Sequence, residues 1–94
     1  MAPASRRRLQ YGYATMSHTP HELHEEFPEQ ADKIHQLKVG DAQFAGLASA
    51  YHDLNRAVHR METGIEAVAD DVLEDTKKRR LALKDEIAAR LTRE

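Results

Sequence analysis

The stretch from Asp41 to Gly64, DAQFAGLASAYHDLNRAVHRMETG, determines how the rest of this chain is organised. Its large apolar residues follow one another at steps of three, four, three, four and three; they are Phe44, Leu47, Tyr51, Leu54, Val58 and Met61. Such steps place side chains on one face of a helix and repeat about every 3.5 residues, the spacing of left-handed coiled-coil packing. We therefore predict a helix over about residues 42–63 whose apolar stripe packs against a partner helix.

Small residues border this stripe, with Ala48 on one side and Ala50 and Ala57 on the other. Small side chains let a third or fourth helix approach closely, so we expect more than two helices to meet here. A single hairpin would cover only one side of the stripe, and self-association is the simplest way to bury the rest.

Composition agrees with a small helical protein. The chain has 94 residues, of which 40% are apolar, 5% aromatic and 32% charged, which fits one small domain built from long helices. The absence of Cys excludes disulfides, thiolate metal sites and Cys nucleophiles. A net charge of -2 argues against a general nucleic-acid binder. The longest nearly apolar run, Phe44 to Tyr51, is far shorter than the roughly 20 residues that span a bilayer, so we expect no membrane association and a cytoplasmic location.

The first 15 residues, MAPASRRRLQYGYAT, show no periodicity, and we interpret residues 1–15 as a disordered tail preceding a single helical hairpin domain at 16–94. Arg6, Arg7 and Arg8 can contact phosphate or anionic lipid, although a solvated tail is the simpler interpretation. Translation from Met16 would remove these three arginines and leave 11 basic against 16 acidic residues. Whether residues 1–15 are made in the cell stays open.

Two helical segments are predicted before the central helix. Thr19 can be an N-cap, with Pro20 at the first helical position and Glu22 completing a capping box, which predicts a helix over 20–26. Pro28 interrupts this helix and begins a second one that continues to Leu37. Gly40 is then expected as its C-cap, and Asp41 as the N-cap of the central helix.

The end of the central helix predicts a hairpin. Gly64 fits the residue after a helix end, and Ile65 is expected to fold back on the last turn. After a connection over 65–69, Asp70 or Asp71 caps a last helix of nearly equal length. Its inner face is predicted to contain Val72, Leu73, Thr76, Leu83, Ile87 and Leu91, with Arg80 intruding. The predicted fold is all-α: an antiparallel two-helix coiled-coil hairpin preceded by a short Pro-kinked N-terminal helix.

Four segments resemble the YdcH family of short bacterial helical proteins: MSHTPHELHEEFPEQADKIHQLK from residue 16, FAGL from 44, YHDLNRAVHRME from 51 and KKRRLALKDEIAARL from 77. The resemblance covers about residues 16–92. It implies a helical hairpin of coiled-coil type, a start near Met16 and a family without an established biochemical function. Thr76 departs from the family, which usually has an apolar residue there, and this departure weakens the hairpin near its loop.

Histidines provide two candidate sites. His18, His21 and His24, with Glu22 and Glu25, have a spacing that allows two imidazoles and a carboxylate to face Zn²⁺ or Ni²⁺. Exposed polar helix positions explain the same pattern, so we predict no metal and no cofactor. Whether this segment binds metal is left for experiment.

The second histidine pair lies on one flank of the central helix. His52 and His59 are seven residues apart, with Arg56 and Arg60 nearby. Imidazoles so placed could make a docking face that responds to pH. The alternative, which we favour, is a solvated flank.

The run Lys77-Lys78-Arg79-Arg80 resembles a nucleic-acid patch, but four consecutive helical residues point in four directions. Asp70, Asp71, Glu74 and Asp75 lie about one turn away and offset its charge. We therefore interpret the run as a solvated face, with the stem of Arg80 lying over the core.

No catalytic constellation is found. The chain has no Gly-rich phosphate loop and no nucleophile elbow, and a hairpin is not expected to enclose a pocket for a small-molecule substrate. We predict a non-enzymatic, cytoplasmic coiled-coil protein that self-associates, docks a partner helix, or both. The residues expected to carry this interaction are Phe44, Leu47, Tyr51, Leu54, Val58, Met61, Leu83, Ile87 and Leu91. The alternative is a small nucleic-acid-associated regulator that uses Arg6–Arg8 and Lys77–Arg80.

Overall fold

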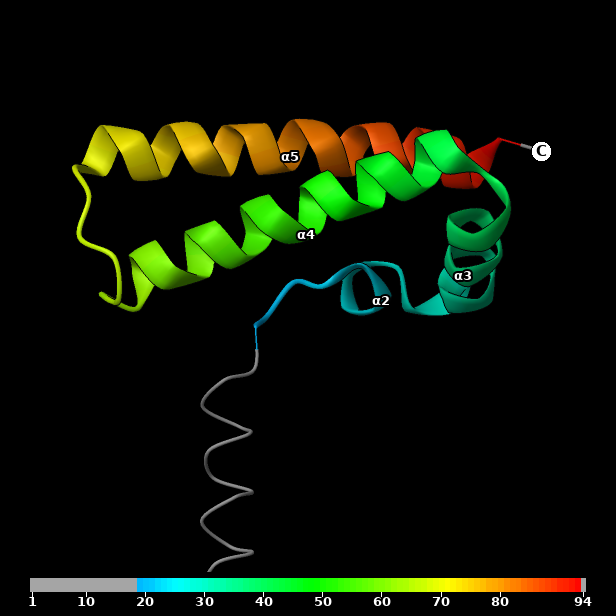
Figure 1. Ribbon diagram of the computed structural model, residues 1–94, viewed down its shortest axis with the longest axis horizontal. Coiled ribbons are helices and arrows are strands. Elements are labelled where there is room, and N and C mark those ends of the chain that lie inside the picture. Colours follow the sequence, from blue (N-terminus) through cyan, green and yellow to red (C-terminus); the bar gives the residue numbers. More distant parts are fainter. Residues whose placement is uncertain (1–18, 94) are drawn as a thin grey trace, which may run out of the picture.

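Two long antiparallel helices form most of the computed structural model, which describes residues 19–93 (Figure 1). They are α4 (Ala42–Glu62) and α5 (Asp70–Thr92). Within residues 19–93, three short elements precede them: α2 (Leu23–Glu26), the 3-10 turn η1 (Pro28–Gln30) and α3 (Ala31–Gly40). The predicted all-α antiparallel hairpin with a Pro-kinked helical segment before it is confirmed, and no strand occurs within residues 19–93. The predicted tail at 1–15, Met16 and His18 lie outside this range.

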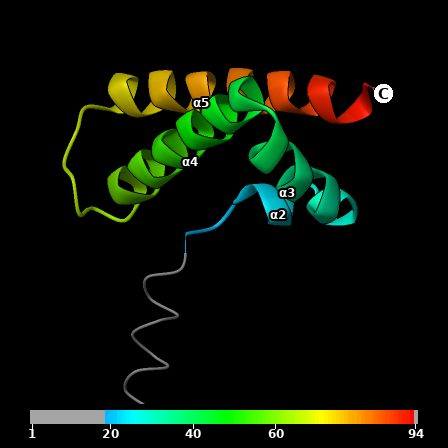
Figure 2. The same ribbon diagram turned by 45° about the vertical axis from the view of Figure 1, so that its right-hand side comes forward.

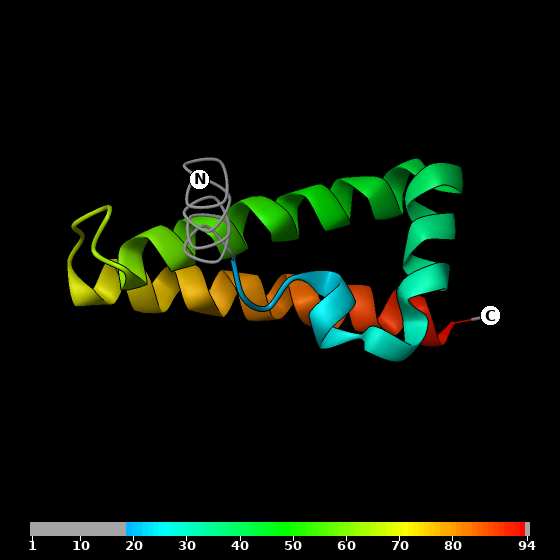
Figure 3. The ribbon, with the colours of Figure 1, turned by 90° about the horizontal axis from the view of Figure 1, so that it is seen from below.

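Helix α3 crosses one end of the hairpin, where α4 begins and α5 ends (Figures 2 and 3). Two side chains at its start reach the end of α5: Lys33 Nζ donates to the Leu91 carbonyl over 2.7 Å, and Gln30 Nε2 donates to the same oxygen over 3.3 Å. The last carbonyls of a helix have no partner within it, so these donors satisfy a group that would otherwise need water. These bonds tie the start of α3 to the end of α5.

The main core lies at this end of the molecule. Its buried members are Leu23, Ile34, Phe44, Ala48, Tyr51, Ile87 and Leu91, with Phe27, Leu37, Leu47 and Leu83 partly buried against them. Toward the loop, the hairpin is more open: Val58 is fully buried, but Val72 is 45% exposed and Ile65 74% exposed. Burial of a large apolar side chain contributes about 1.5–3 kcal/mol, so most of the stabilising burial is concentrated where α3 covers the hairpin.

The predicted helix over 20–26 is too long at its start. Helix α2 begins only at Leu23, with Glu22 as N-cap, and His21 has a positive φ of 66°. Thr19 is not the cap, because the carbonyls of Pro20 and His21 accept hydrogen bonds from α4 side chains instead of from the next helical turn. Tertiary contacts therefore replace the local capping signal.

The junction of α3 and α4 confirms one predicted cap and corrects another. Asp41 Oδ1 accepts hydrogen bonds from the backbone N–H groups of Gln43 (3.0 Å) and Phe44 (3.1 Å), as an N-cap should. Gly40 is the last residue of α3, which extends three residues past the predicted end at Leu37, and its φ is not positive. The chain turns at Asp41 in extended backbone, so no left-handed glycine is needed.

At the other end of α4, Gly64 has φ +82° and occupies the residue after the helix end, as predicted. Its N–H bonds the Met61 carbonyl over 3.4 Å, but Glu66 rather than Ile65 donates to the Arg60 carbonyl. The expected fold-back of Ile65 is therefore wrong, since that side chain points to solvent.

The start of α5 also differs from the prediction. Its N-cap is Ala69, with no side-chain hydrogen bond, and the N–H groups of Val72 and Leu73 bond the Ala69 carbonyl. Asp70 and Asp71 lie inside the first turn, where their charge still favours the positive end of the helix dipole.

Candidate interaction surface

The buried face of α4 is rotated relative to the predicted stripe. Five residues of the predicted interface are buried: Phe44, Tyr51 and Val58 in α4, and Ile87 and Leu91 in α5. Four other residues of the predicted interface are only partly buried: Leu47, Leu54, Met61 and Leu83. In α4 their places in the buried row are taken by Ala48 and Asn55, which are 4% and 1% exposed.

A buried polar network explains this rotation. Asn55 Nδ2 donates to the Pro20 carbonyl over 2.8 Å, and Asn55 Oδ1 accepts from Arg80 over 2.8 Å. The Tyr51 hydroxyl donates to the His21 carbonyl over 2.6 Å. Three segments, the chain before α2, α4 and α5, are thus joined by hydrogen bonds, and no buried side-chain polar atom within residues 19–93 lacks a partner.

Burial sets the ionisation of Tyr51. Loss of solvent around the hydroxyl, with the nearby charge of Glu26 adding to the effect, raises the pKa of Tyr51 to about 12. The hydroxyl therefore stays neutral and donates to the His21 carbonyl. Sequence reasoning missed this network because it assigned no role to Asn55. The available signal was that Asn55 and Arg80 both lie beside apolar rows on helices that were expected to pack together.

Ion pairs fasten the N-terminal segment to α5. Lys84 pairs with Glu26, and Glu26 also makes a hydrogen bond of 3.0 Å with His21 Nδ1. The hydrogen bond from Lys84 is the main reason that the pKa of Glu26 lies below its usual range, and the bond with His21 adds to the effect. Arg90 pairs with Asp41. The Phe44 N–H is the main reason that the pKa of Asp41 is lowered, and Arg90 adds to it. Lys84 and Arg90 also lie over the rings of Phe27 and Phe44, 6.0 and 5.9 Å from the ring centres.

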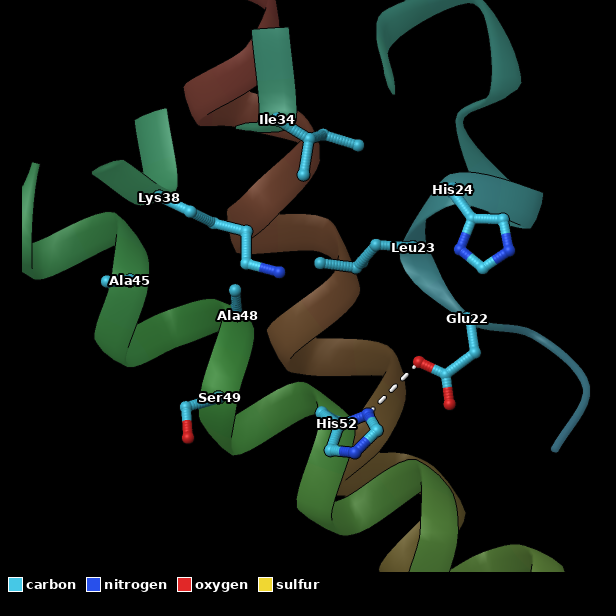
Figure 4. Close-up of a pocket in the computed structure, with 9 residues that line it drawn as sticks. All are labelled: Glu22, Leu23, His24, Ile34, Lys38, Ala45, Ala48, Ser49 and His52. Atoms are coloured by element: carbon cyan, nitrogen blue, oxygen red, sulfur yellow. Dashed lines mark hydrogen bonds and ion pairs between the residues drawn. The ribbon is translucent and has the colours of Figure 1, made fainter. Parts of the chain in front are cut away.

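A groove of about 390 Å³ runs between α2, α3 and α4 (Figure 4). Leu23, Ile34 and Ala48 form its apolar floor, and its polar edge includes a hydrogen bond between His52 Nδ1 and Glu22 Oε1 at 3.1 Å. This groove belongs to the side of α4 that the N-terminal segment already covers. The predicted flank of His52 and His59 is therefore not one uniform solvated face, because His52 contacts Glu22.

The basic run at 77–80 is largely engaged within the molecule. Lys77 pairs with Glu62 at 3.0 Å, and this hydrogen bond raises the pKa of Lys77. Arg79 pairs with Asp75 at 3.1 Å, while Arg80 bonds Asn55. Lys78 is exposed. The carboxylates of Glu62 and Asp75 offset the charges of Lys77 and Arg79, and the bond to Asn55 holds the Arg80 guanidinium against α4, so the run is less suited to binding phosphate.

The histidine cluster gains no support as a metal site in the part of the chain that the structure describes. No group of three or more His, Asp or Glu side chains there could hold a metal ion. His21 instead bonds Glu26. His18, the third member of the predicted cluster, lies outside residues 19–93.

The opposite side of α4 carries an apolar row that the N-terminal segment does not cover. We call it the open flank; it consists of Leu47, Ala50, Leu54, Ala57 and Met61, at steps of three, four, three and four. Ala50 is exposed and the other four are half-buried. A second hollow of about 390 Å³ lies at its α3 end, lined by Gln43, Leu47, Glu86, Ala89, Arg90 and Arg93.

This hollow shows which part of α5 borders the open flank. Glu86 and Arg90 line it, and Leu83 lies three residues before Glu86 on the same side of the helix. Val72 lies three helical turns before Leu83, so it extends the same side toward the loop. Leu83 and Val72 therefore extend the apolar surface of the open flank onto α5, on a side that also carries Glu86 and Arg90.

A family model described as a protein of unknown function, DUF465, matches residues 44–91. The chain belongs to this family. It is the YdcH-like family of small helical proteins, so the predicted resemblance is confirmed. The DUF465 match begins in the first turn of α4 and ends in the last turn of α5, so the hairpin with its open flank is the part that the family model covers. No curated protein and no solved structure matches the chain.

Between residues 19 and 93, no helix is both long and apolar enough for a membrane span.

Proposed function

We propose that this protein is a non-enzymatic, cytoplasmic interaction protein that binds a helix through its open flank. The bound helix belongs either to another copy of the chain or to a partner protein. The observation that carries the proposal is that the N-terminal segment covers one side of α4 and not the other. The side with Ala48 and Asn55 is covered by the segment before α4, whereas the heptad-spaced apolar row of the open flank is only partly buried. A row with this spacing is the surface that a second helix packs against.

The residues around this surface are suited to holding it rigid. The Asn55–Arg80 bond and the Lys84–Glu26 and Arg90–Asp41 pairs fix α4, α5 and the N-terminal segment relative to one another. A surface that is ordered before binding loses less conformational entropy when a partner docks. This arrangement supports a binding role.

The alternative role in nucleic-acid binding is less well supported. Lys77, Arg79 and Arg80 make contacts within the chain, so little of the basic run is left for phosphate. The other half of that hypothesis, Arg6–Arg8, lies outside residues 19–93. Retention of single-stranded RNA on a filter at low salt, abolished by removal of residues 1–15, would favour this alternative.

A photo-crosslinking amino acid tests the proposal in cells. Placed at Ala50, which is exposed on the open flank, it should give crosslinked protein species on irradiation. The matched control is Arg56, which is also exposed on α4 but lies away from the apolar row. Equal crosslinking from both positions, or none from Ala50, would contradict a binding role for the open flank.

A further inference from the structure

The open flank is nearly symmetrical about Leu54. Leu47 and Met61 lie seven residues before and after it, and Ala50 and Ala57 lie four before and three after. When two such rows run antiparallel, Leu54 faces Leu54, each alanine faces an alanine, and each Leu47 faces a Met61. A surface that matches itself in this way is the requirement for a two-fold interface between identical chains.

The two ends of the row differ in shape, and they differ in a complementary way. Leu47 borders the hollow of about 390 Å³, whose other apolar lining residue is Ala89. Met61, at the other end, is a long unbranched side chain of the kind that fills irregular gaps. Antiparallel packing places the Met61 of one copy at the hollow of the other, twice per pair. Parallel packing would bring hollow against hollow and leave both unfilled.

The available area is of the size that a stable dimer needs. Helix α4, with 21 residues, is about 32 Å long, and two adjacent helices are about 20 Å wide, which gives a flat footprint of roughly 600 Å². Standard interfaces bury about 800 Å² of accessible surface per partner, and side-chain relief makes the accessible surface larger than the footprint. A net charge of only -2 per chain adds little repulsion between copies.

We propose that the occupant of the open flank is a second copy of this chain, packed antiparallel with its α4 across the first and centred on Leu54, to form a four-helix dimer of two hairpins. This inference rests on the proposed function, because it names the partner of the same surface. It also assigns Met61 to the hollow beside Leu47 of the other copy.

Light scattering on the purified full chain, at about 100 µM so that micromolar affinities are detected, is the first test. The expected mass is twice the chain mass of 10.7 kDa. Ala50→Glu should give the single-chain mass with unchanged helical circular dichroism, since residue 50 is exposed in one hairpin but lies within the interface, one helical turn from its centre at Leu54, in the proposed dimer. The control Arg56→Glu should stay dimeric. A single-chain mass for the wild type, or a dimeric Ala50→Glu, overturns the inference.

Disulfide formation tests the direction of packing, because the chain has no Cys of its own. In the antiparallel dimer, position 50 lies near position 57 of the other copy and about 12 Å from its own counterpart, too far for a disulfide. A mixture of Ala50→Cys and Ala57→Cys chains should therefore form a mixed disulfide, while neither variant alone should crosslink. Disulfides within each variant alone would show parallel packing and overturn the inference.

The outcomes separate this inference from the proposed function. A monomeric purified chain that still gives crosslinks from Ala50 to other proteins in cells refutes the second copy and keeps the binding role. A monomer without crosslinks from Ala50 refutes both.

Discussion

The most informative substitution is Asn55→Ala, because Asn55 joins three segments and is 1% exposed. Its amide donates to the Pro20 carbonyl and accepts from Arg80, each over 2.8 Å. Replacement by Ala removes both bonds at once. It leaves the Pro20 carbonyl and the Arg80 guanidinium without their partners beneath the N-terminal segment.

The expected loss follows from these two bonds. A neutral hydrogen bond contributes about 0.5–1.5 kcal/mol and one to a charged group about 1.5–3 kcal/mol. Alanine's higher helix propensity offsets about 0.5 kcal/mol of this loss. We therefore expect Asn55→Ala to lower the free energy of unfolding by about 1.5–4 kcal/mol.

Urea unfolding followed by circular dichroism measures this loss, and a double-mutant cycle assigns it. Arg80→Met keeps the apolar stem of Arg80 but removes the guanidinium. The cycle of Asn55→Ala with Arg80→Met should show a coupling of at least about 1 kcal/mol. Arg56→Ala, an exposed control on α4, should change stability by no more than about 0.5 kcal/mol. A loss below about 1 kcal/mol for Asn55→Ala, or negligible coupling, would refute the network as the cause of the rotation of α4.

Three further predictions concern packing, backbone and pH, and urea unfolding measures each. Ile87→Ala should lower the free energy of unfolding by about 2–5 kcal/mol because Ile87 is fully buried. Leu54 is only half-buried, so Leu54→Ala should lower it by about 1–2 kcal/mol in a monomeric chain. Equal losses from the two variants would mean that the burial is misassigned. Gly64→Ala should destabilise the protein by about 1–2 kcal/mol because Gly64 has a φ of +82°. Gly40 lies in a helix with open space around it, so Gly40→Ala should stabilise the protein. The opposite order would contradict the loop geometry. The pKa of Asp41 is lowered on folding from its ordinary value of 3.8, so its contribution is present above that value and is lost as the pH falls through the folded pKa. Asp41→Asn keeps a good N-cap without the charge and should therefore lose less stability than the wild type between about pH 5 and pH 2; identical acid sensitivity would rule out this role for Asp41.

Local signals in the sequence were reliable where nothing else competed for the same backbone groups. Asp41 caps α4 and Gly64 takes the left-handed conformation after it, as their residue types predict. Thr19 had an equally good local signal, yet α2 starts at Leu23. Tyr51 and Asn55, 32 and 36 residues further on, bind the carbonyls that an earlier helix start would have used.

The candidate surface was only partly predictable. The alanine shoulders Ala50 and Ala57 already indicated a second side of α4 that another helix could approach. Leu54, however, was expected in the stripe that packs against a partner helix, together with Phe44, Tyr51 and Val58, and the structure leaves it half-buried at the centre of the open flank.

The sequence by itself determined that residues 42–62 form a helix, that the last helix returns antiparallel to it, and which family the chain belongs to. Periodicity and turn residues decide these features, since both act over a few neighbouring residues. Only the tertiary structure decided how far α4 is rotated about its own axis. A repeat of three and four fits two adjacent rows, Phe44–Ala48–Tyr51–Asn55–Val58 and Phe44–Leu47–Tyr51–Leu54–Val58, equally well. The first row is buried because Asn55 meets Arg80 and the Pro20 carbonyl, partners far away in the chain, and this leaves Leu47 and Leu54 only partly buried on the open flank.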